Sequence, residues 1–183
     1  MNLSPVPFWF LRHGETDWNA QNLSQGNVDI PLNPTGLAQA HAAAARLRHR
    51  GIVNIVSSPL SRAADTARIV ADALGLAVSF DEELREVSFG VQEAKPMAGA
   101  WFAEWVEGIA TPDQAESFAE LRLRAARAIN RALELPAPVL VVAHGALFRA
   151  LRADMGLEPN VRTPNATPFW CEPGNPWTLT EAS

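Results

Sequence analysis

The sequence predicts an α/β fold, a three-layer αβα sandwich with a mostly parallel central sheet. Three segments each contain a short apolar run, a polar turn and a helical pattern that ends near a glycine, which is typical of strand–helix units. The apolar runs are continuous and do not alternate with polar residues, as expected for strands covered on both faces. The chain of 183 residues has the length of one domain, which we assign to residues 1–183.

The first unit begins with the run FWFL at residues 8–11, which we interpret as a buried strand. A polar loop follows, and an alanine-rich helix is predicted up to Arg50. Asn33 suits the N-cap of this helix, Pro34 its first turn, and Gly51 the position after its end.

The second and third units repeat this arrangement. The second has a predicted strand at residues 52–56, a turn at 57–59 and a helix over 61–74 that Gly75 closes. The third has a strand at residues 139–142, then His144 and Gly145, and a helix to about Met155 that Gly156 closes.

The remaining elements lie between and after these units. We predict a strand at residues 78–80, a short helix near 101–107, a long helix near 116–134, and a terminal hairpin over 166–179 that turns at 173–175. The segment of about residues 91–115 is predicted as a short, lid-like insertion in the single domain. Its aromatic residues Trp101, Phe102 and Trp105 are expected either in the core or over a bound ligand.

Composition excludes several classes of protein. The net charge of −5 disfavours binding to nucleic acid or to an anionic membrane, so an anionic ligand needs a local cationic pocket. The single cysteine, Cys171, permits no internal disulfide, and neither a signal peptide nor an apolar run of transmembrane length is evident. We therefore expect a cytoplasmic protein without a metal or other cofactor. His41 and His49 are expected on the surface, and the oligomeric state is left open.

Cationic and imidazole side chains follow each of the three main strands. Arg12 and His13 follow the first, Arg62 comes soon after the second, and His144 follows the third. In such sheets ligands bind beyond the carboxyl ends of the strands, so these side chains are expected to converge. Arginine forks suit phosphate oxygens, and an imidazole held between arginines stays neutral and nucleophilic. We also expect the glycine after each histidine to permit a sharp turn and the close approach of a ligand.

Phosphoryl transfer also requires a proton donor for the leaving oxygen. The acidic stretch at residues 81–86 supplies several candidates, and spacing alone does not choose among them.

Four motifs resemble those of the histidine phosphatase (phosphoglycerate mutase-like) superfamily and occur in that family's order. The motifs are RHGET at residues 12–16 with Trp18, Asn19 and 25–26, then SSPLSRA at 57–63 with 66–67, LRE at 84–86 with 89–90, and VVAHG at 141–145. The resemblance covers roughly residues 8–155 and favours the small phosphatase branch.

The resemblance implies a role for each matching residue. His13 would be the nucleophile that forms a phosphohistidine, and Glu86 would exchange protons with the leaving group and with water. The phosphoryl oxygens would be held by Arg12, Arg62 and His144. The substrate side would be lined by Asn19, Gln25, Gly26 and Gly145.

Three functions fit these residues. A metal-independent phosphomonoester hydrolase that acts on a small-molecule phosphate is favoured. A mutase-type isomerase needs additional anion-binding side chains, and Lys95 is the only cation in residues 91–112. A non-catalytic phosphate-binding module would be expected to lack a pocket residue, and none is missing.

Overall fold

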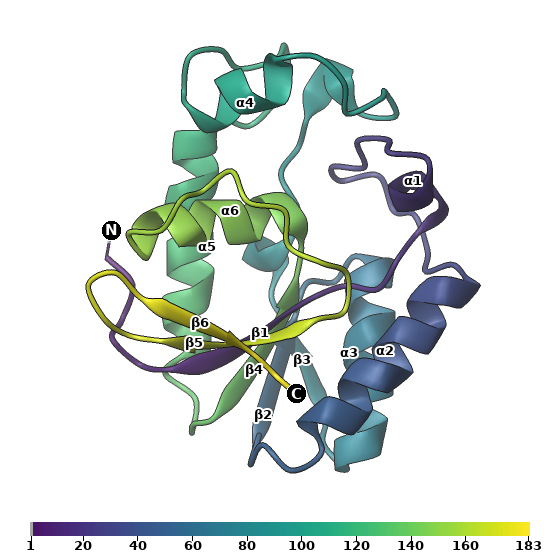
Figure 1. The fold of residues 1–183 in the computed structure, drawn as a ribbon, viewed down its shortest axis with the longest axis vertical. Helices are drawn as coiled ribbons and strands as arrows, with labels where there is room; N and C mark the ends of the chain where they lie inside the picture. Colours follow the sequence, from purple (N-terminus) through teal and green to yellow (C-terminus); the bar gives the residue numbers. More distant parts are fainter. Residues whose placement is uncertain (1) are drawn as a thin grey trace.

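The computed structural model describes residues 2–183 and contains one mixed sheet of six strands (Figure 1). The strand order is β3-β2-β4-β1-β5-β6. Neighbours among the first four strands are parallel, and β5 is antiparallel to both β1 and β6. The strands are β1 (Phe8–Arg12), β2 (Asn54–Ser57), β3 (Val78–Phe80), β4 (Val139–Ala143), β5 (Pro168–Glu172) and β6 (Thr178–Glu181).

Helices cover both faces of this sheet because the side chains of each strand alternate between two apolar clusters. In β1, Phe8 and Phe10 join the cluster that contains residues of α5 and α6, whereas Trp9 and Leu11 join the cluster with α2 and α3. The helices are α1 (Asp17–Ala20), α2 (Pro34–Leu47), α3 (Ser61–Leu74), α4 (Trp101–Val106), α5 (Phe118–Ala132) and α6 (Gly145–Asp154), with 3₁₀ turns at Glu82–Leu84 and Gly90–Gln92.

Most predicted elements are present with shifted ends. The alanine-rich helix ends at Leu47 instead of Arg50, because the N–H of Arg50 bonds back to the Leu47 carbonyl in a tighter turn. The long helix begins at Phe118, because Ser117 caps it and forms a capping box with Glu120. The terminal hairpin is present as β5 and β6 and makes the sheet mixed.

Among residues 2–183, the α-helix that was not predicted from the sequence is α1, which lies in the predicted polar loop. Thr16 and Asn19 form a capping box around its single turn. A helix of four residues has too short a pattern to be recognised from apolar periodicity. None of the helices in residues 2–183 is long and apolar enough to cross a membrane.

The aromatic cluster near α4 belongs mainly to the core. Trp105 is fully buried, its ring nitrogen donates to the Glu116 carbonyl oxygen at 2.9 Å, and it packs against Phe89, Phe102 and Phe118. The core interpretation is therefore confirmed for Trp105. In Figure 1 the segment around α4 lies beyond α6, on the side toward which the parallel strands point. A lid function for residues 91–115 stays a prediction.

Candidate active site

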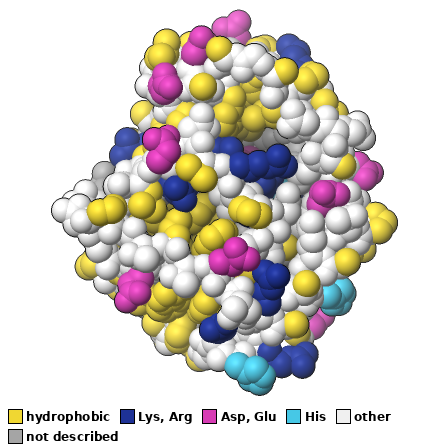
Figure 2. Space-filling view, viewed as in Figure 1, with side chains coloured by type: hydrophobic (Ala, Val, Ile, Leu, Met, Phe, Trp, Pro, Cys, Tyr) yellow, Lys and Arg dark blue, Asp and Glu magenta, His cyan; other side chains and the backbone are white. Residues whose placement is uncertain are grey.

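A cavity opens at the carboxyl ends of the parallel strands. Figure 2 shows a hollow on this face, with Lys or Arg side chains inside it and hydrophobic side chains along its upper rim. Its walls are formed by Arg12, His13, Asn19, Asn22, Leu23, Ser24, Gln25, Gly26, Arg62, Glu86, Phe89, Met97, Phe102, Gly145, Ala146, Arg149 and Arg162. Eight of the nine residues predicted for the site are in this set, and His144 is not.

His13 follows β1 and is held in one orientation. Its backbone N–H donates to the Ala143 carbonyl of the neighbouring strand at 3.0 Å, which continues the β1–β4 pairing. Its ring Nδ1 lies 2.7 Å from the Gly14 carbonyl oxygen, so Nδ1 carries the proton and Nε2 keeps a lone pair. Burial first, and then the charges of Arg62 and Arg12, hold the pKa of His13 well below its ordinary value. The ring is therefore a neutral imidazole with a lone pair on Nε2, and His13 lines the cavity.

The sharp turn predicted at the glycines after the two histidines is not what requires glycine there, and the predicted close approach of a ligand stays a prediction. Neither Gly14 nor Gly145 has a positive φ, so neither position needs the left-handed conformation of a sharp turn. A side chain on Gly14 would collide with the Gly36 carbonyl oxygen, because the two backbones pass very close together. A side chain on Gly145 would lie 3.3 Å from Nε of Arg12. Glycine at these positions permits tight packing around the site.

Arg12 and Arg62 both line the cavity. Arg12 donates to the Thr163 carbonyl at 2.6 Å, and Arg62 donates to the Val28 and Gly26 carbonyls at 2.9 and 2.8 Å. In both side chains Nε is buried without a partner among residues 2–183. Burial lowers the pKa of each guanidinium to about 10, so both remain cationic near neutral pH. Both guanidiniums therefore keep donor groups free for an anion.

His144 lies behind the cavity wall. It is completely buried, and its ring centroid is 5.2 Å from that of His13. Its Nε2 lies 2.7 Å from Oγ of Ser58, and its Nδ1 is buried without a partner in the described chain. Burial, followed by the charge of Arg62, lowers the pKa of His144. The predicted contact of His144 with a phosphoryl group therefore requires that the group enter deeper than the present cavity surface.

Glu86 is anchored against the start of α6, close to the histidines. Its carboxylate accepts N–H groups from Val87, Ala146 and Leu147 at 3.1, 2.9 and 3.0 Å. The positive end of a helix favours a negative group at this position. The neighbours Leu84 and Val87 are fully buried and fix the loop on either side.

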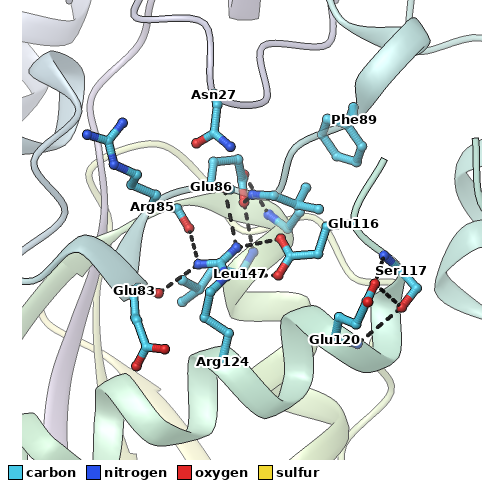
Figure 3. Close-up of polar contacts among 12 residues, drawn as sticks. Asn27, Glu83, Arg85, Glu86, Phe89, Glu116, Ser117, Glu120, Arg124 and Leu147 are labelled. Atoms are coloured by element: carbon cyan, nitrogen blue, oxygen red, sulfur yellow. Dashed lines mark hydrogen bonds and ion pairs between the residues drawn. The ribbon is translucent and has the colours of Figure 1, made fainter. Parts of the chain in front are cut away.

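Arg124 of α5 braces the same loop from behind. Figure 3 shows its guanidinium between the carboxylate of Glu116 and the backbone of the Glu86 loop. It donates to the carbonyls of Glu83 and Arg85 at 2.7 and 2.8 Å. Arg124 is therefore structural.

The remaining acidic residues of the loop point elsewhere. Asp81 and Glu83 form ion pairs with Arg127 and Arg131 on the outer side of α5. Geometry thus separates Glu86 from its neighbours, which spacing alone had not done.

The predicted substrate-side residues are held by a short chain of polar contacts. Thr16 donates to Oε1 of Gln25 at 2.7 Å, and Oδ1 of Asn19 accepts from the Thr16 N–H at 3.2 Å. Because each side-chain oxygen is already engaged, the amide N–H groups of Asn19 and Gln25 remain available to a ligand. Asn165 also orients the site, since its amide donates to the His13 carbonyl at 3.0 Å and to Asn19. Asn165 was not predicted from the sequence, because no motif marks the loop before β5.

Two arginines on the cavity wall were also missed. Arg149 lies one helical turn after Gly145 on α6, and Arg162 lies in the loop after α6. The i, i+4 spacing to Gly145 was the signal that could have located Arg149. Lys95, Arg122 and Arg124 do not line the cavity.

No group of three or more His, Cys, Asp or Glu side chains within residues 2–183 is arranged to hold a metal ion. His41 and His49 are exposed on and after α2, as predicted.

Comparisons with known proteins agree with this site. The sequence model of the histidine phosphatase superfamily (branch 1) matches residues 8–165. A probable phosphoglycerate mutase GpmB of Yersinia enterocolitica is 41% identical over 163 residues, which cover 83% of this chain and 76% of that protein. Its counterpart in Yersinia pestis is 42% identical over 147 residues, covering 75% and 68%.

Solved structures are also similar. A mycobacterial glucosyl-3-phosphoglycerate phosphatase in complex with VO3 has a TM-score of 0.84 and 28% identity, with 97% of each chain covered. A structure described as mycobacterial hydrolase 2 has a TM-score of 0.82 and 30% identity, with 97% of this chain and 91% of that chain covered. From the shared sheet, the convergent motifs and the match over residues 8–165, this chain belongs to the histidine phosphatase superfamily, branch 1.

Proposed function

We propose that this protein is a metal-independent phosphomonoester hydrolase that acts on a small-molecule phosphate through a phosphohistidine on His13. One observation carries the proposal: the Gly14 carbonyl fixes the proton on Nδ1 of His13, so that Nε2 presents its lone pair among arginines. Helices on both faces, in the proposed αβα layering, leave the strand ends as the open edge where the substrate enters.

In the first step Nε2 of His13 attacks phosphorus, and the bond from phosphorus to the leaving oxygen breaks. Arg12 and Arg62 bind the equatorial oxygens and neutralise their charge, and the buried Nδ1 of His144 supplies a further donor. The charges of the two arginines also favour the neutral form of His13, so the nucleophile is retained at neutral pH.

Glu86 moves the protons. Its protonated carboxyl gives a proton to the leaving oxygen, so the product departs as an alcohol. The resulting carboxylate then takes a proton from the water that attacks the phosphohistidine, and the nitrogen–phosphorus bond breaks to release inorganic phosphate. Each cycle returns His13 and Glu86 to their starting protonation states.

The direct alternative is a mutase-type isomerase, in which the phosphohistidine returns its group to another oxygen of the retained product. The names of the relatives from Yersinia favour this alternative. The sequence argument against it relied on a shortage of cations in residues 91–112, but Arg149 and Arg162 reach the cavity from elsewhere. We retain hydrolysis because the solved structure with the highest TM-score given above is a phosphatase.

The test is a panel of phosphomonoesters assayed for inorganic phosphate in the presence of EDTA. The wild type is expected to release phosphate, and His13→Ala to release none above background. His41→Ala is the matched control, because it removes an exposed histidine outside the cavity. Full loss of activity with EDTA would contradict the metal-free mechanism.

A second measurement separates the three functions. With 3-phosphoglycerate as substrate, a hydrolase yields glycerate and phosphate, whereas a mutase yields the isomeric phosphoglycerate with negligible phosphate. Binding of phosphomonoesters without turnover, and with no difference between wild type and His13→Ala in product formation, would support the non-catalytic module instead.

A further inference from the structure

The cavity wall carries more positive charge than the proposed phosphoryl transfer uses. Four arginines line it, and its one acidic residue, Glu86, offsets at most one of their charges, so a surplus of at least three positive charges remains with neutral histidines. A phosphomonoester supplies about two negative charges. At least one positive charge is then unbalanced in a partly buried site, where an unpaired charge is costly.

Arg149 is a cation of this wall whose guanidinium has no partner in the described chain. It is half-buried, and no hydrogen bond or ion pair to it is formed by residues 2–183, while its Nε is buried without a partner. Its guanidinium carbon lies 4.8 Å from the ring centroid of Phe102, so the side chain is stacked against an aromatic wall of the cavity. Burial lowers the pKa of Arg149, the charge of Glu86 opposes this shift, and the charge of Arg162 adds to it. The contact with Phe102 leaves the N–H donors of the guanidinium without a partner among residues 2–183.

Several arginines outside the cavity form ion pairs with acidic side chains, whereas Arg149 forms none within residues 2–183. On α5, Arg122 pairs with Asp154 and Arg124 pairs with Glu116. Arg149 has no such partner, although it lies on the helix that begins beside the His13 pocket. Its position one turn from Gly145 places it on the same helix face as the start of the site.

Arg162 lies beside it because the neighbouring residue is tied to the site. The Thr163 carbonyl accepts a hydrogen bond from Arg12 at 2.6 Å, which holds the loop of Arg162 against the cavity. Met97, Leu23 and Phe102 add apolar surface to the cavity wall. The wall therefore combines a phosphate pocket, a short apolar stretch and a second pair of cations.

We infer that Arg149, with Arg162 beside it, binds a carboxylate on the leaving group of the phosphomonoester. One carboxylate offsets positive charge that a phosphoryl dianion leaves over, and its two oxygens match an arginine fork. This inference rests on the proposed function only in treating the ligand as a substrate. The second anion-binding site can be tested without turnover. Arg149 is therefore a specificity-determining residue.

The test measures binding in the His13→Ala background, so that turnover does not interfere. The probes are 3-phosphoglycerate and glycerol 3-phosphate, which differ in a carboxylate against a hydroxymethyl group. Calorimetry is expected to give tighter binding of 3-phosphoglycerate. Adding Arg149→Met, which keeps an apolar stem against Phe102, is expected to lower the affinity for 3-phosphoglycerate by about 10- to 100-fold. Glycerol 3-phosphate is expected to change by less than about threefold.

Two further variants serve as a conservative replacement and as a control for the loss of a positive charge. Arg149→Lys is expected to restore part of the preference, because it keeps the charge but not the fork. Arg68→Gln removes a positive charge from the exposed side of α3 and is expected to leave both affinities unchanged. Thermal melts show whether each variant is folded.

The outcomes are distinct. Equal binding of the two probes by His13→Ala, or equal weakening of both by Arg149→Met in a folded protein, would overturn the inference. Arg149 could instead be needed for the preference for fructose 1,6-bisphosphate over fructose 6-phosphate, and not for the preference for 3-phosphoglycerate over glycerol 3-phosphate. That result would assign the site to a second phosphate and contradict the carboxylate. If the carboxylate preference depends on Arg149 while the wild type hydrolyses nothing, the binding site stands and the proposed hydrolysis fails.

Discussion

Glu86→Gln replaces one carboxylate oxygen by an amide nitrogen and removes the proposed acid while keeping its shape. The two carboxylate oxygens now accept N–H groups from Val87, Ala146 and Leu147. A glutamine oxygen can keep the two donors that share Oε1, Val87 and Leu147, so the Ala146 N–H then faces an amide nitrogen. We expect this mismatch to lower the free energy of unfolding by about 1–3 kcal/mol.

The kinetic effect depends on the leaving group. For an alkyl phosphomonoester, whose alkoxide needs a proton, kcat is expected to fall by about 10²- to 10⁴-fold. For 4-nitrophenyl phosphate the leaving phenolate is stable without that proton, so phosphorylation of His13 is expected to be affected less. The attack of water still lacks its base, and nitrophenol is therefore expected to appear in a stoichiometric burst followed by slow turnover.

Stopped-flow absorbance measures the burst, and phosphate release measures the alkyl substrate. Glu82→Gln is the matched control, because Glu82 is an exposed acid of the same loop that pairs with Arg85. An equal loss with both substrates, or a similar loss in Glu82→Gln, would refute the assignment of Glu86 as the proton donor.

Two further changes follow from burial. Because the fold lowers the pKa of His13 and of His144, the unfolded chain binds more protons below about pH 6.5; stability is therefore full above that pH and is lost as the pH falls, by up to about 1.4 kcal/mol per pH unit for each imidazole. Urea unfolding at several pH values checks this, and an unchanged slope in His13→Gln would contradict it. Trp105→Ala is expected to lower the free energy of unfolding by about 3–5 kcal/mol, since it empties a fully buried position. Chemical denaturation measures that loss, and a loss below about 1 kcal/mol would contradict the core assignment.

The sheet and the His13 pocket could be predicted because local signals agree with the global arrangement. Apolar runs mark the strands, and parallel strands bring their carboxyl ends together, so Arg12, Arg62 and Gly145 converge in space. The hairpin at the end was located from its turn residues. That it pairs with β1, and so makes the sheet mixed, depends on long-range packing that no local pattern records.

The parts that could not be predicted depend on side-chain direction and on close backbone contacts. Gly14 is explained by the approach of Gly36, which comes from a different segment. Glu86 is separated from Glu83 only by where the braced loop points each carboxylate. Arg149 carries no motif, and its place on the wall follows from the rotation of α6.

The central claim is that His13 receives the phosphoryl group, and trapping the phosphoenzyme tests it most directly. Wild-type protein is mixed with 4-nitrophenyl phosphate, quenched in alkali, which preserves phosphohistidine, and examined by intact-mass and peptide mass spectrometry. We expect one added phosphoryl group on the peptide that contains His13, stable to base and labile to acid, and none in His13→Ala. A phosphoryl group on another residue, or turnover by His13→Ala at the wild-type rate, would contradict it.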